Sequence, residues 1–210
     1  YLDLVCIGTI SDIVPLVDEN RVIAKLGLKL IEQTKNIGLR TLLNIANFKK
    51  IDSNAISFGV APRINACGRM GAQEEALKLF LTEDKQEALK IAKNLVKFNQ
   101  ERQNTEKQIF EDVIQEIEKN NDKEKKCIVL AKENWHHGII GIVSSKVTEM
   151  YYKPSILICL EGDMGKGSGR SVPGFDLYNA LSKCNNYIEK FGGHSMAIGI
   201  SIKKENFEKL

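Results

Sequence analysis

The spacing of apolar residues along the chain changes its period near residue 126. Before that point, apolar positions recur mainly every three or four residues, as at Val22, Ile23, Leu26 and Leu30, which is typical of helices. We expect Gly38 to stop the first of these helices. The predicted helices cover 20–32, 39–47, 51–61, 74–81 and 84–120, with an apolar strand or helix over 4–13 and a loop over 62–71.

Beyond residue 126, short apolar runs alternate with turn residues. Alternation of strands with helices is the pattern of an α/β fold. The predicted strands cover 127–131, 155–160, 166–172 and 199–202, the helices 139–152 and 175–188, and a turn 191–194. We therefore expect an α/β protein whose C-terminal part is a small mixed sheet with flanking helices.

The longest predicted helix carries a polar segment in its middle. Residues 99–108 contain no apolar side chain, whereas apolar stripes precede and follow them. A helix that is polar all round is typical of a bridge through solvent between two lobes, and a helix in a polar bundle is the alternative. We expect two lobes, residues 1–82 and 122–210, joined by a connector helix over 83–121.

Composition narrows the class of protein without identifying it. Hydrophobic residues are 43% and charged residues 27% of the chain, as in globular proteins with a core, and the net charge of +3 is too small to predict a nucleic-acid partner. Five scattered cysteines without a C-x-x-C pair favour a reducing cytoplasm over a disulfide framework. The chain begins at Tyr1 within an apolar stretch and shows no signal pattern, so we expect a cytoplasmic fragment of a longer protein.

One carboxylate directly follows the first apolar segment. Asp12 ends the sequence Gly-Thr-Ile-Ser-Asp over residues 8–12, where the backbone would hold it rigidly beside a cleft. Mg²⁺ and Mn²⁺ prefer carboxylate oxygens in such places. A single aspartate does not make a metal site, and helix capping is the alternative.

Two arginines and an asparagine follow Pro62. Arg63, Asn65 and Arg69 lie in the predicted loop, where Gly68 would let a ligand approach the backbone. The guanidinium fork matches the oxygens of a phosphate. The alternative is that Arg63 pairs with an acid and pins the loop.

Three further segments carry polar groups beside glycine. His136 lies between a predicted strand and helix, at a helix N-terminus that favours anions. The segment 165–171 lacks the spacing of a P-loop and fits a shallow anion cradle. Ordinary loop residues, a glycine-rich hairpin and, for residues 192–194, a tight turn are the alternatives.

In this order and spacing, these segments resemble the RecJ family of single-strand-specific exonucleases, within the DHH phosphoesterase superfamily. The resemblance implies that residues 1–82 are the C-terminal part of a DHH domain and that 122–210 form a DHH-associated C-terminal substrate-binding domain. It rests on Gly8-Thr9-Ile10-Ser11-Asp12-Ile13-Val14-Pro15-Leu16, Pro62-Arg63-Ile64-Asn65-Ala66, His136 with Gly138, Ser168 with Arg170 and Ser171, and Phe191-Gly192-Gly193-His194.

The resemblance also implies a role for each candidate residue. Asp12 would be the last carboxylate of a site for two Mn²⁺ or Mg²⁺ ions. Arg63, Asn65 and Arg69 would flank the cleft. The surface that binds phosphate would comprise His136, Ser168, Arg170, Ser171, Gly192, Gly193 and His194.

Arg170 is expected to contact a DNA phosphate together with Ser168. Gly167 and Gly169 remove side-chain bulk from the predicted strand, so that a sugar-phosphate backbone could approach it. The alternative is an ion pair of Arg170 with an acid such as Asp163 or Asp176.

The function implied by the resemblance is hydrolysis of single-stranded DNA, from the 5′ end, in DNA repair and recombination, with repair or recombination proteins as further partners. The family's earlier motifs, an Asp-x-Asp, a separate Asp and the Asp-His-His, are absent from this chain, so we expect it to be inactive alone. Two alternatives stay open. One is a related phosphodiesterase for short oligonucleotides or cyclic dinucleotides, and the other is a non-catalytic DNA-binding scaffold.

Overall fold

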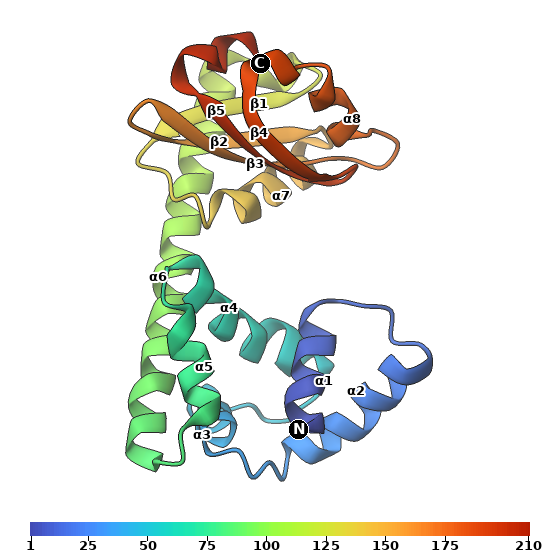
Figure 1. The fold of residues 1–210 in the computed structure, drawn as a ribbon, viewed down its shortest axis with the longest axis vertical. Coiled ribbons are helices and arrows are strands. Elements are labelled where there is room, and N and C mark those ends of the chain that lie inside the picture. Colours follow the sequence, from blue (N-terminus) through green and yellow to red (C-terminus); the bar gives the residue numbers. More distant parts are fainter. The chain divides into compact units, whose positions relative to one another are not determined.

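The computed structural model describes all residues from Tyr1 to Leu210 and divides into two compact units, residues 1–102 and 103–210. The first unit is built of helices, and the second is built around a five-stranded sheet (Figure 1). The α/β class predicted from the sequence is confirmed. The boundary between the units falls inside helix α6 (Lys85–Asn120), and a separate connector domain over 83–121 stays a prediction.

Six helical segments precede α6 in the first unit, and the predicted helices over 20–32, 39–47 and 74–81 are present among them. The first apolar segment, predicted as strand or helix, is a helix. The segments are α1 (Leu2–Ser11), α2 (Asp18–Ile31), α3 (Ile37–Ala46), a π-helical turn (Ala55–Val60), α4 (Ala61–Arg69) and α5 (Gln73–Leu81).

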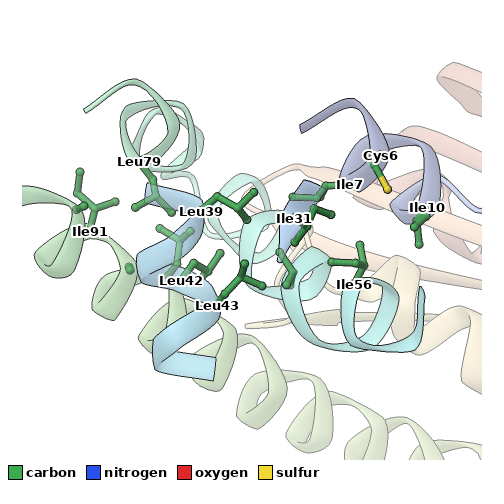
Figure 2. Packing of buried hydrophobic residues seen from close by; sticks show 14 of the residues in the cluster. Cys6, Ile7, Ile10, Ile31, Leu39, Leu42, Leu43, Ile56, Leu79 and Ile91 are labelled. Carbon is green, nitrogen blue, oxygen red and sulfur yellow. The ribbon is translucent and has the colours of Figure 1, made fainter. Parts of the chain in front are cut away.

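The core of the first unit gathers side chains from several of these helices. Ile31, Leu39, Ile56 and Leu79 are almost fully buried and belong to one cluster (Figure 2). Gly38 lies inside α3 and does not stop the preceding helix, which ends at Ile31. A Cβ at Gly38 would lie 1.8 Å from the Leu79 carbonyl oxygen, so close packing of α3 against α5 explains this glycine.

The prediction of a loop over 62–71 is wrong for most of that segment, because α4 follows directly on the π-helical turn. The wide turn is closed by the Ala61 N–H, which donates to the Ile56 carbonyl. Pro62 then occupies the first turn of α4, a position that proline favours because its fixed φ suits the start of a helix. Ala61 keeps helical angles (φ −56°, ψ −44°) despite preceding a proline, so the local preference against that conformation is overridden.

The second unit is a mixed sheet with the strand order β1-β2-β3-β5-β4, in which β1 and β2 are parallel and the other neighbours antiparallel. Strand β4 was not predicted, because its residues were assigned to the end of a helix and a turn. Its two glycines and mostly exposed residues hide the usual alternation of a strand. The elements are β1 (Ile128–Glu133), α7 (Ile140–Tyr151), β2 (Ser155–Glu161), β3 (Met164–Arg170), α8 (Leu177–Ser182), β4 (Ile188–His194) and β5 (Ala197–Lys203).

Helices α7 and α8 pack against opposite faces of this sheet. Ser144 and Thr148 of α7 bond the Ser155 hydroxyl at 2.8 Å, which places α7 on the face that Ser155 shares with Arg170. Buried leucines of α8 join a cluster of isoleucines on the other face. None of the helices, α6 included, combines the length and apolar character that crossing a membrane requires.

The polar segment of α6 was expected to be exposed on all sides, but the structure shows that part of it is buried. Asn99 and Glu106 are buried, whereas Gln103, Asn104 and Lys107 are exposed. Glu106 is 2.5 Å from the Lys146 ammonium of α7, within the second unit. Polar side chains can be buried when partners satisfy them, and periodicity alone does not show those partners.

Candidate nucleic-acid interface

The glycines of β3 lie on the face of the sheet opposite to α7. Cβ atoms added at Gly165, Gly167 and Gly169 would collide with isoleucine side chains of β2 and β5; at Gly167, for example, Ile200 Cγ1 lies at 2.7 Å. The alternating glycines therefore make room for this apolar layer. The prediction that Gly167 and Gly169 let a DNA backbone approach the strand is wrong.

The other face of β3 carries Lys166, Ser168 and Arg170, because successive residues of a strand point to opposite sides. A Cβ at Gly141, in the first turn of α7, would lie 2.9 Å from Ser168 Oγ and 3.4 Å from Arg170 Nη2. Ser168 and Arg170 therefore lie beside the N-terminus of α7, where backbone N–H groups have no intrahelical acceptor.

Arg170 is held in place by its own strand. Its Nη1 donates to Ser168 Oγ at 3.1 Å and to the Gly169 carbonyl at 2.9 Å. Asp163 lies at the far end of β3, directly before Met164. Asp176 accepts from the Asn179 N–H and caps α8, which packs on the opposite face of the sheet. Neither aspartate is therefore placed beside Arg170, and a fold-stabilising acidic partner of Arg170 stays an open alternative.

The strand register brings two separate sequence segments onto this same face. In one row across the sheet, Arg170 pairs with Ala197 and Ala197 pairs with His194. In the next row, Ser168 pairs with Gly199 and Gly199 pairs with Gly192. We call this surface the β3–β5–β4 polar face. It comprises Lys166, Ser168 and Arg170 of β3, Ala197, Gly199 and Ser201 of β5, and Lys190, Gly192 and His194 of β4.

The glycines that open this face are Gly192 and Gly199. Nothing lies within 4 Å of a Cβ added at Gly192, and the nearest atom at Gly199 is the Gly167 carbonyl oxygen, 4.0 Å away. Both are exposed. Sequence reasoning missed Gly199, although its place between Ile198 and Ile200 shows the alternation of a strand with one open face.

Two of the predicted residues do not belong to the polar face. Ser171 is buried, and its hydroxyl donates to the Phe175 carbonyl at 2.8 Å, so it serves the loop after β3. Gly193 has a φ of +136°, and a Cβ there would lie 2.2 Å from the Ala197 carbonyl oxygen. Gly193 therefore allows the close approach of β4 and β5.

His136 lies in the loop that leads into α7. Its carbonyl accepts from the Ile139 and Ile140 N–H groups, and its Nδ1 accepts from the Gly138 N–H at 3.1 Å. Burial, and then the neighbouring His137, lower the pKa of His136. The imidazole is thus favoured in its neutral form with the proton on Nε2, which can donate to an anion.

The adjacent Trp135 anchors this loop to α6. Trp135 is buried, and its Nε1 donates to Asp112 Oδ2 at 2.7 Å. Asp112 Oδ1 also accepts from the Lys132 ammonium at 2.5 Å. Burial acts to raise the pKa of Asp112, but the hydrogen bonds from Lys132 and Trp135 outweigh it and leave the pKa below its usual value.

Asp12, in the first unit, follows the last residue of α1. It is exposed, its backbone N–H donates to the Gly8 carbonyl, and its carboxylate is at the negative end of the helix dipole. An aspartate that caps a helix stands at the N-terminal end, so capping does not explain Asp12. No group of three or more His, Cys, Asp or Glu side chains in the chain could hold a metal ion, and the residues present do not make a two-metal site.

Arg63, Asn65 and Arg69 all lie on α4, but not on one side of it. At 100° per residue, Asn65 and Arg69 share a face and Arg63 points elsewhere. Arg63 Nη1 donates to the Gly59 carbonyl at 2.5 Å, and its guanidinium lies 6.0 Å from the Phe48 ring centroid. Its Nε is buried without a partner, and no acid pairs with it, so the alternative of a loop-pinning ion pair is wrong.

Comparison with known proteins defines first the class of the second unit. Residues 124–210 match the DHHA1 domain family. The whole chain is 38% identical to a segment of the single-stranded-DNA-specific exonuclease RecJ of Bacillus subtilis, over 27% of that protein, and 32% identical to RecJ of Escherichia coli, over 38% of it.

Solved structures give the same result. The chain superposes along its full length on 31% of RecJ from Thermus thermophilus in complex with Mn²⁺, with a TM-score of 0.90 and 33% identity. The resemblance to the RecJ family that its motifs predicted is confirmed along the whole chain. It spans about a third of the length of these relatives.

Proposed function

We propose that this chain is the part of a metal-dependent, single-stranded-DNA exonuclease that grips the DNA backbone. The observation that carries the proposal is the strand register, which places Ser168, Arg170, Gly192 and His194 on one face although two separate segments supply them. The family's description as single-stranded-DNA-specific exonucleases supports it. Cleavage from the 5′ end, and a role in cytoplasmic DNA repair and recombination, form part of the same proposal.

The polar face suits a phosphate rather than a base edge. Arg170 and Ser168 donate from one strand, and the Gly192 and Gly199 positions leave room for a phosphate group above the sheet. Contacts to phosphate position a nucleic acid without reading its sequence. We therefore expect binding that is insensitive to base composition and strongly dependent on salt.

Substitution of Arg170 tests this proposal. Arg170→Ala should weaken binding of single-stranded oligonucleotides about equally for all sequences and make the salt slope shallower by roughly one unit. Arg170→Lys should restore the charge but not the bidentate fork. Affinity across a salt series and the melting temperature are measured on the same samples.

The two measurements separate binding from stability. A fold-stabilising role alone would lower the melting temperature and leave affinity and salt slope unchanged. Unchanged affinity of Arg170→Ala at every salt concentration would refute the proposed function.

Nuclease activity is not expected of the 210-residue chain by itself. Asp12 is a single exposed carboxylate, and one carboxylate cannot position two hard cations. The purified chain should leave single-stranded DNA intact with Mn²⁺ or Mg²⁺. Metal-dependent degradation that Asp12→Ala abolishes would contradict this expectation.

A further inference from the structure

The β3–β5–β4 polar face continues beyond the residues assigned so far. Lys166 of β3 lies opposite Ser201 of β5, which lies opposite Lys190 of β4. Both lysines are exposed, and the Ser201 side chain is half-buried between them. We propose that these three residues bind a second backbone phosphate of single-stranded DNA, and that Glu161 weakens this contact. The inference rests on the proposed function and extends the same site by one nucleotide.

The spacing of the two rows fits a nucleic-acid backbone. The row of Lys166, Ser201 and Lys190 is two residues along the strands from the row of Ser168, Gly199 and Gly192. Two residues of a strand span about 7 Å, which is comparable to the step between successive phosphates of an extended single strand. A strand whose phosphate lies over Gly199 would therefore bring a neighbouring phosphate over Ser201.

The donors of this row suit a phosphate. Two ammonium groups flank a hydroxyl, and ammonium groups bind phosphate as point charges without a fixed fork geometry. Lys190 takes part in no ion pair within the chain. With no bulky side chain at Gly192 or Gly199, nothing on the sheet separates the two rows.

Glu161 is the acid placed to oppose this contact. Its Oε2 is 3.6 Å from the Lys166 ammonium, and its Oε1 is 3.3 Å from His137 Nδ1. Lys166, and then the hydrogen bond from His137, lower the pKa of Glu161, so it is ionised at neutral pH. Both members of the Lys166–Glu161 pair are about half exposed, and such pairs are weak. A phosphate can therefore compete with Glu161 for Lys166, at a cost in affinity.

Variants with opposite expected signs test the inference. The 210-residue chain is titrated with a 5′-phosphorylated oligothymidylate of eight nucleotides, by fluorescence anisotropy across a salt series. The double variant Lys166→Gln/Lys190→Gln should bind about fivefold more weakly, with a salt slope shallower by about 0.7 for each phosphate that is no longer neutralised. Glu161→Gln should bind more tightly than the unmodified chain, by about twofold.

Two controls change the same charges elsewhere in the second unit. Lys126→Gln/Lys183→Gln removes two exposed lysines that lie before β1 and after α8. Glu133→Gln removes a carboxylate that pairs with Lys204 and lies on the other face of the sheet. Each control removes the same charge as its test variant, so both feel the same long-range electrostatic effect. Each control should therefore change the affinity much less than its test variant does.

Arg170→Ala, titrated in parallel, distinguishes the inference from the proposed function. If Arg170→Ala weakens binding but the double lysine variant matches its control, the second phosphate site is refuted and the proposed function stands. If Glu161→Gln binds no better than Glu133→Gln, the opposing role of Glu161 is refuted. Failure of every variant to change affinity, or no binding of the oligonucleotide at all, would overturn both.

Discussion

The two units of this chain present their candidate residues in different ways. In the helical first unit, Asp12 stands at the end of one helix, and Arg63 and Asn65 point to different sides of another. In the second unit, hydrogen-bonded register places residues from three strands on one surface. Helices spread neighbouring residues around an axis, whereas a sheet collects every second residue of each strand.

This difference explains why the candidate residues of the second unit share one surface, whereas those of the first unit do not. The strand pairing of the sheet alone places Arg170, Ser168 and His194 on one face. Asp12 is one carboxylate without a neighbouring cluster of His, Cys, Asp or Glu side chains. The contrast also predicts that substitutions act on the units in different ways.

The largest effects are expected at one tightly packed glycine in each unit. Gly38→Ala would place a Cβ 1.8 Å from the Leu79 carbonyl oxygen, and Gly193→Ala would place one 2.2 Å from the Ala197 carbonyl oxygen. Each should destabilise its own unit by about 3 kcal/mol, because backbone atoms must move. Hydrogen exchange should show faster opening of amides in residues 1–102 for the first variant and in 103–210 for the second.

Gly8→Ala serves as the control in this comparison. Gly8 lies in α1 with nothing within 4 Å of an added Cβ, so the variant should be more stable by up to about 1 kcal/mol from helix propensity. Loss of protection spread evenly over both units in Gly38→Ala or Gly193→Ala would show that the units do not open separately.

A smaller effect is expected at the anchor of the His136 loop. Asp112→Ala leaves the buried Trp135 N–H without its acceptor, which should cost about 1–3 kcal/mol in unfolding free energy. Trp135 is the only tryptophan of the chain, so its fluorescence reports the unfolding directly. Glu116→Ala, which removes only a contact to Lys132, should cost less than about 1 kcal/mol. Equal losses in the two variants would argue against the anchor.

Substitutions of glycines on the two faces of the sheet should separate effects on binding from effects on stability. Gly192→Ala adds a Cβ to the open face and should weaken oligonucleotide binding about tenfold, the equivalent of removing one hydrogen bond to a charged group, at unchanged melting temperature. Gly169→Ala would place a Cβ 2.8 Å from Ile198 Cδ1 and should cost about 1–3 kcal/mol of stability without weakening binding by the folded chain. The reverse pattern would mean that the two faces are wrongly assigned.

The smallest effect concerns the protonation of His136. Burial lowers the pKa of His136. At a pH below the ordinary histidine pKa of about 6.5, the folded state therefore binds fewer protons than the unfolded state. Stability should therefore fall as the pH drops from about 6.5 through the pKa of the folded state. A bound phosphate favours the charged imidazole and should raise this pKa. NMR titration of His136, with and without a 5′-phosphorylated oligothymidylate, measures both; an unchanged pKa would place His136 away from the phosphate.

Much of the fold could be predicted from apolar spacing, because long amphipathic helices and short buried strands leave clear patterns. The failures have local causes. Pro62 was taken as a break, although the π-helical turn before it carries the chain straight into α4. Strand β4 was missed because an edge strand with two glycines buries little of its length.

The candidate site could be predicted as a set of residues but not as a surface. Ser168, Arg170 and His194 were identified, but the reason given for the glycines beside them was wrong. The sequence shows that glycines alternate along β3, and only the packing of β2 and β5 shows which face they occupy. Ser171 was included because it follows Arg170, although its side chain turns inward after the strand ends.

The alternation of β3 has a consequence for how such a domain can change over time. Gly165, Gly167 and Gly169 are constrained by the isoleucines packed on them, whereas Lys166 and Ser168 touch no part of that layer. Exposed residues of the open face, such as Lys166 and Lys190, can therefore be exchanged one by one at little risk to folding. A selection library confined to positions 166, 190 and 201 would vary ligand affinity while keeping a folded scaffold, and so would make this sheet a starting point for new binding specificities.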